Sequence, residues 1–154
     1  MNRAKQILWI HLGTVYWWCD FFLEAGLSET KVRVERPAFD MDEEQFFQFC
    51  QLNRDWRIER SVERDLEVMV PLGGETSDRN SEINMQLRQW AKRNGAGVAF
   101  DSNGGFILPN RAMRSPDVSW VRRERLANLT AEQKQRFLPL CPDFVIELRS
   151  PLTH

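Results

Sequence analysis

The chain has 154 residues, of which 42% are hydrophobic and 28% are charged, and its formal net charge is −1. This length suits one domain, and the composition excludes a wholly disordered chain. The near-neutral charge excludes a strong general attraction to polyanions, although it leaves room for a local basic groove.

Residues 1–37 are expected to form an N-terminal extension and linker outside the core. Residues 7–19 are apolar and aromatic, which leaves three interpretations open: an extension or packed helix, an upstream stretch that is not normally translated, or a membrane or export signal. The stretch is short for a membrane span, so we expect no membrane attachment and a cytoplasmic protein. Residues 28–40 are polar and contain Pro37, which is typical of a linker.

The remaining residues, 38–154, are expected to form a single domain that begins with a helix and two strands. Acidic residues at 42–44 suit a helix N-terminus, and Phe46 and Phe49 then share one helical face. Residues 56–70 predict two strands around a turn. The segment PLGGET at 71–76 predicts a loop.

The strongest helical pattern covers about residues 78–93. Ser77 or Asp78 can cap its start, Ile83 and Leu87 lie on its apolar stripe, and Gly95 can terminate it. The pattern predicts a helix that packs one face against a sheet.

Short strands dominate the last third of the chain. Residues 98–101 and 105–108 predict two strands joined as a hairpin by the turn Asn103-Gly104. Strands are also expected at 117–121 and 143–149, with a short helix from Thr130 between them. The order of elements indicates an α/β or α+β fold, a mixed sheet flanked by helices.

Two acidic residues stand beside apolar strands. Asp117 begins the strand at 117–121, and Glu147 lies inside the run at 143–149. Hydrolysis of a phosphodiester requires a divalent cation held by hard oxygen ligands, and carboxylates on adjacent strands can supply them. The residues alone also allow structural roles, in which Asp117 caps a turn and Glu147 pairs with an arginine.

The order of several motifs resembles the Uma-type restriction endonucleases, a branch of the PD-(D/E)XK nuclease superfamily. The resemblance runs from about residue 38 to residue 151 and rests on the segments WRIER, PLGGET, DSNGGFILPN, SPDVSWV and PDFVIELRSP. It implies a restriction-endonuclease-like fold and an endonuclease that hydrolyses DNA with Mg²⁺ or Mn²⁺, without a small-molecule cofactor. A homodimer is compatible with it.

The resemblance also implies roles for individual residues. Asp117 and Glu147 correspond to the metal-binding acids, and Glu59 in RIER is expected to face the site. Glu82 is at a helix position where the superfamily often places a further metal-supporting acid, although an ordinary solvated position is an equal alternative. For Asp101, a turn residue is the preferred interpretation.

Two departures from the family pattern affect the expected activity. Arg149 stands where the superfamily has a lysine, and an arginine can stabilise phosphate charge but cannot act as a base. The family's downstream lysine-bearing helix and closing strands lie beyond His154, so we expect a C-terminally truncated member with an incomplete fold. A catalytically decayed binding module is therefore the alternative function.

Overall fold

The computed structural model describes residues 31–34 and 40–148. Its helices are α1 (Glu43–Leu52), α2 (Gly74–Asn94), α3 (Arg123–Ala127) and α4 (Ala131–Lys134). Its strands are β1 (Lys31–Val34), β2 (Ile58–Arg60), β3 (Leu66–Met69), β4 (Gly97–Asp101), β5 (Phe106–Ile107), β6 (Met113–Arg114), β7 (Val118–Arg122) and β8 (Phe144–Ile146). The expected α/β class is confirmed.

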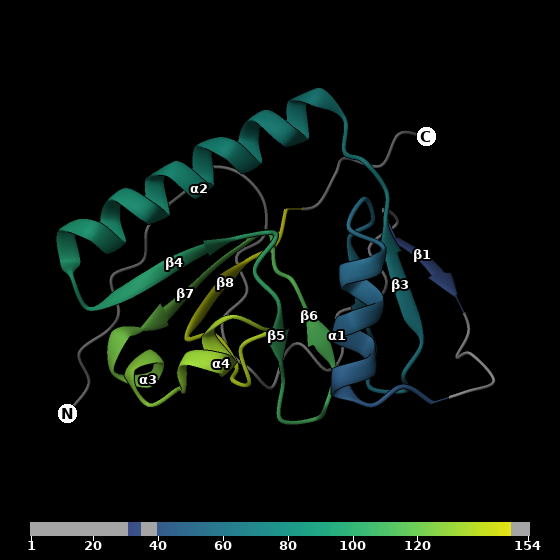
Figure 1. The fold of residues 1–154 in the computed structure, drawn as a ribbon. Helices are drawn as coiled ribbons and strands as arrows, with labels where there is room; N and C mark the ends of the chain where they lie inside the picture. Colours follow the sequence, from purple (N-terminus) through teal and green to yellow (C-terminus); the bar gives the residue numbers. More distant parts are fainter. Residues whose placement is uncertain (1–30, 35–39, 149–154) are drawn as a thin grey trace.

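The described strands divide between two sheets. A five-stranded sheet has the order β1-β3-β2-β6-β5, and a three-stranded sheet has the order β4-β7-β8. Neighbouring strands in both are antiparallel, and one isolated parallel bridge joins Phe106 to Leu138. The helix α1 lies against the five-stranded sheet, whereas α2 runs along the three-stranded sheet (Figure 1).

Each long helix buries an apolar stripe against its own sheet. Phe46 of α1 packs with Ile58 and Met113 of the five-stranded sheet. Ile83 of α2 packs with Val118 of the three-stranded sheet. This burial fixes which side of α2 faces β7, and the same side therefore approaches the residues that precede β7.

The start of α1 confirms the expectation from its acidic residues. Asp42 is the N-cap, and its carboxylate accepts the backbone N–H of Gln45 at 2.8 Å. The Gln45 side chain in turn accepts the N–H of Asp42 at 3.0 Å, which completes a capping box. Asn53 ends the helix as expected.

Three local expectations differ from the structure. Residues 31–34, expected in a linker, form the edge strand β1, which pairs with β3; the other residues before 40 lie outside the described part. The helix α2 begins at Gly74 rather than near residue 78, because extended Gly73 serves as its N-cap. Residues 98–101 and 105–108 form no hairpin: β4 pairs with β7, and β5 pairs with β6.

Candidate functional site

Asp117 lies where the chain crosses from one sheet to the other. Strand β6 of the five-stranded sheet ends at Arg114, and β7 of the three-stranded sheet begins at Val118. The connection Ser115-Pro116-Asp117 is buried. Because both sheets fix this connection at its ends, the Asp117 side chain has a well-defined place between them.

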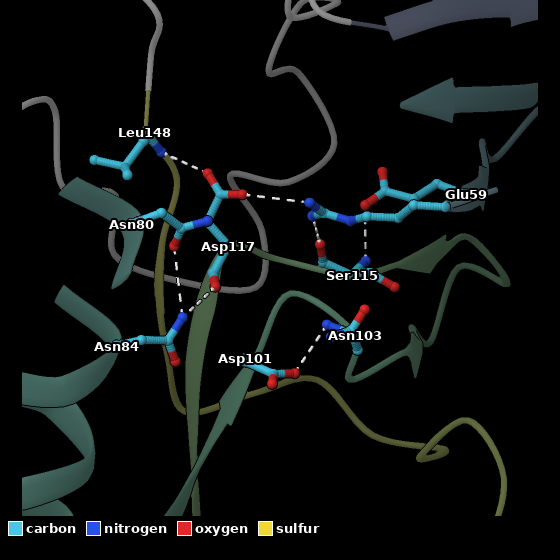
Figure 2. Close-up of polar contacts among 9 residues, drawn as sticks. Glu59, Asn80, Asn84, Asp101, Asn103, Ser115, Asp117 and Leu148 are labelled. Atoms are coloured by element: carbon cyan, nitrogen blue, oxygen red, sulfur yellow. Dashed lines mark hydrogen bonds and ion pairs between the residues drawn. The ribbon is translucent and has the colours of Figure 1, made fainter. Parts of the chain in front are cut away.

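Protein donors hold both oxygens of the Asp117 carboxylate. Oδ2 accepts the backbone N–H of Leu148 at 2.9 Å, and Oδ1 lies 3.5 Å from Nη1 of Arg57. Figure 2 shows the carboxylate next to Leu148, whereas Asn84 of α2 reaches the backbone carbonyl oxygen of Asp117. The side chain is 9% exposed, so these contacts orient a carboxylate that is almost shielded from solvent.

Glu147 follows β8 directly, at the same end of the three-stranded sheet. Val118 lies opposite Ile146 in the β7–β8 register, so one further step along both strands sets Asp117 opposite Glu147. Residues directly opposite each other in an antiparallel pair share a face of the sheet. The side chain of Glu147 is half-buried. The topology therefore brings the two predicted metal-binding positions to neighbouring strand ends.

Arg57 is a site residue that the sequence analysis did not single out. Its Nη2 donates to the carbonyl oxygen of Ser115 while its Nη1 faces Asp117. Its buried Nε donates to no acceptor among the described residues. The alternation in RIER was an available signal, because Arg57 and Glu59 fall on the same side of an extended chain. Arg57 thus adds a cation directly beside the carboxylate.

Glu59 anchors the segment that leads to Asp117. Its Oε1 accepts the backbone N–H of Ser115 at 2.8 Å (Figure 2). Its Oε2 lies 3.2 Å from Nη1 of Arg114, and the same nitrogen lies 2.7 Å from Oε2 of Glu67. Only 1% of the Glu59 side chain is exposed. These contacts give Glu59 a structural role, and its expected role in catalysis stays a prediction.

The other candidate residues make contacts of their own or lie outside the described part. Glu82 is exposed on α2 and accepts a hydrogen bond from Gln86. Asp101 accepts the backbone N–H of Asn103 at 2.9 Å, which confirms the preferred interpretation as a turn residue. Arg149 lies outside the described residues.

Helix α2 contributes amide side chains where an acid was expected. Asn84 Nδ2 donates to the carbonyl oxygen of Asp117 at 3.3 Å and lies 3.5 Å from Oδ1 of Asn80. Both asparagines lie between α2 and Asp117 in Figure 2. The spacing of 80 and 84 beside the apolar stripe of Ile83 and Leu87 was the signal for this placement.

The donor chemistry at Asp117 fits a hard divalent cation. No group of three His, Cys, Asp or Glu side chains within the described ranges is arranged to hold a metal ion. Mg²⁺, however, is commonly held by one or two carboxylates, with waters completing its octahedral shell. Asp117 and Glu147 could supply such carboxylates, and the oriented, shielded Asp117 would be the firmer of the two ligands.

Comparison with known proteins gives one family. The family model Uma2, described as "Putative restriction endonuclease", matches residues 43–154. A search of curated proteins found no match. None of the helices in the described segments is both long enough and apolar enough to cross a membrane. The match includes β2, α2, β7 and β8, which together surround Asp117.

Proposed function

The chain belongs to the Uma2 family and has a restriction-endonuclease-like α/β fold, and from this premise we propose that it is a metal-dependent endonuclease that hydrolyses DNA phosphodiester bonds. The observation that carries the proposal is the position of Asp117. Its carboxylate is shielded, oriented by two donors, and placed at the strand end next to the β8 terminus that bears Glu147. Such a carboxylate suits a metal ligand better than a surface cap.

In this proposal, Asp117 and Glu147 would hold Mg²⁺ or Mn²⁺, and the bound ion would supply water activation and charge neutralisation. The N–H of Leu148 keeps the Asp117 carboxylate in one orientation. The guanidinium of Arg57 lies beside it and can offset negative charge on a phosphate. Arg149 would also offset negative charge on the phosphate rather than act as a base, because an arginine stays protonated and cannot accept a proton from water.

Conversion of a supercoiled plasmid to its nicked form tests this function directly. We expect nicking with Mg²⁺ or Mn²⁺ and none above background with EDTA, because the reaction needs the cation to activate water. Nicking that is equally fast in EDTA would contradict a metal-dependent mechanism. No nicking with either ion, at protein concentrations that bind the plasmid, would favour the decayed binding module.

A metal-free binding module remains a second candidate, and the contact between Arg57 and Asp117 favours it. The guanidinium of Arg57 already faces the Asp117 carboxylate and can balance its negative charge in place of a metal ion. The 3.5 Å between Nη1 of Arg57 and Oδ1 of Asp117 is long for a strong ion pair. A metal ion could therefore displace Arg57 from the carboxylate.

The variant Arg57→Gln distinguishes these two candidates. We expect it to bind Mn²⁺ about two- to tenfold more tightly, because the competing positive charge is gone. A thermal-shift titration with Mn²⁺ measures the change, and Arg54→Gln, an exposed arginine three residues away, is the matched control. If neither the wild type nor Arg57→Gln is stabilised by Mn²⁺, the metal-dependent function fails.

A further inference from the structure

An open pocket between α2 and the end of β4 borders the candidate metal site. It has a volume of about 660 Å³. The described residues that line it come from α2 as far as Arg88, from β4 and from the residue that follows β4: Ser77, Asn80, Ser81, Asn84, Met85, Arg88, Ala99, Asp101 and Ser102. We call it the α2 groove. Asn84 connects it to the site, because its amide donates to the carbonyl oxygen of Asp117.

The lining of the α2 groove is mainly polar and rich in hydrogen-bond donors. Ser77 and Asn80 donate no side-chain hydrogen bond to any acceptor in the described residues. Pockets for small organic ligands are usually more enclosed and mostly apolar. An open groove lined with hydroxyl and amide groups suits an extended polar chain instead.

The charges in the groove indicate what kind of polar chain it would take. Arg88 is exposed. Within the described part of the chain its guanidinium makes one long contact, 3.5 Å to the carbonyl oxygen of Ala99, so it is available to an anion. The one acidic lining residue, Asp101, lies at the β4 end and accepts the N–H of Asn103. Serine, asparagine and arginine side chains are typical contacts for the sugar-phosphate backbone of nucleic acids.

We propose that the α2 groove binds the sugar-phosphate backbone of a DNA strand and leads it to Asp117. The proposal rests on the proposed endonuclease function and specifies where its substrate lies. Neutral donors and a single cation can position a nucleic-acid backbone without a large basic surface. Such a site is therefore compatible with the net charge of −1 of this chain. Met85, 47% exposed at the groove, offers an apolar contact for a sugar.

A charge placed inside the groove, compared with the same charge outside it, tests the proposal. Ser81→Glu introduces a carboxylate in the groove, and Gln89→Glu introduces one elsewhere on α2; both positions are exposed. Both variants change the net charge equally, so any general electrostatic effect is matched. The probe is a fluorescein-labelled DNA oligonucleotide, single-stranded or duplex, and fluorescence anisotropy in EDTA measures its Kd.

We expect Ser81→Glu to weaken DNA binding about fivefold or more and Gln89→Glu to change it less than about twofold, because one repelled phosphate contact affects only the groove variant. Arg88→Gln is a second variant expected to weaken binding, with a shallower salt dependence. Equal effects of Ser81→Glu and Gln89→Glu, or no binding by the wild type, would overturn the proposal.

The two proposals fail separately in these experiments. Binding is measured in EDTA, where no hydrolysis occurs, whereas the proposed function is measured as metal-dependent plasmid nicking. Groove-dependent binding without nicking would overturn the endonuclease function and retain the DNA site. Metal-dependent nicking with no difference between Ser81→Glu and Gln89→Glu would overturn the α2 groove as the DNA site and retain the endonuclease.

Discussion

Asp117→Asn is expected to reduce metal-dependent plasmid nicking by at least about 100-fold, which corresponds to about 2.7 kcal/mol of transition-state stabilisation. The substitution removes the negative charge that attracts a divalent cation but leaves the size of the side chain unchanged. Its remaining carbonyl oxygen can still accept the N–H of Leu148, which lies 2.9 Å from Oδ2 in the native protein. Nicking rates at saturating Mg²⁺ and Mn²⁺ measure the effect.

Two comparisons separate loss of the metal ligand from loss of the fold. The free energy of unfolding of Asp117→Asn should fall by no more than about 1 kcal/mol, because only a long, partly exposed ion pair with Arg57 is lost. Asp55→Asn makes the same chemical change at an exposed position and should nick at the wild-type rate. If Asp117→Asn nicks as fast as the wild type, Asp117 is not the metal ligand.

Short-range signals predicted the individual elements around the site. The acidic residues before Phe46 located the start of α1, and the compact apolar run Phe144–Ile146 predicted β8. Gly95 was expected to end α2, and it does so in a left-handed conformation with φ of 72°. Such signals depend on neighbouring residues in the chain, so the sequence alone contains them.

Pairing between distant strands was much harder to predict. The Asn103-Gly104 turn suggested a hairpin, and a tight turn does form there, with Gly104 N–H donating to the Asp101 carbonyl oxygen. The strands on its two sides nevertheless enter different sheets. Which partner a short strand selects depends on packing over the whole domain rather than on the turn.

The sequence singled out Asp117 and Glu147, which the structure brings to neighbouring strand ends, but it did not single out Arg57 or the two asparagines of α2. The sequence drew attention to Asp117 and Glu147 because acids are unusual beside apolar strands. Arg57, Asn80 and Asn84 are ordinary residue types for an exposed strand end or helix face, so only their spacing, and not their type, could have indicated them. Their importance comes from the three-dimensional arrangement, in which α2 and the chain before β2 meet the connection between the sheets.

Arg114→Met is expected to destabilise the protein by about 3–5 kcal/mol, the usual effect of removing one partner from a buried ion pair. Nη1 of Arg114 lies 3.2 Å from Glu59 and 2.7 Å from Glu67, and these carboxylates face each other across β2 and β3. Burial lowers the pKa of Arg114, but the two carboxylates raise it by more, so the net pKa lies above its ordinary value. The arginine therefore remains charged at any pH at which the protein is handled.

Urea unfolding of Arg114→Met measures this loss, and Arg125→Met is the matched control. Arg125 is 37% exposed and pairs with Asp143 at 3.1 Å, and Asp143 keeps a second contact with Arg122, so this variant should lose less than about 1 kcal/mol. Glu59 also accepts the N–H of Ser115, two residues before Asp117. Loosening this cluster should therefore displace the Asp117 carboxylate and reduce nicking even under conditions in which Arg114→Met stays folded. Equal losses of stability in the two variants would show that the Glu59–Arg114–Glu67 cluster stabilises the fold no more than an exposed ion pair does, and unchanged nicking by Arg114→Met would show that it does not position Asp117.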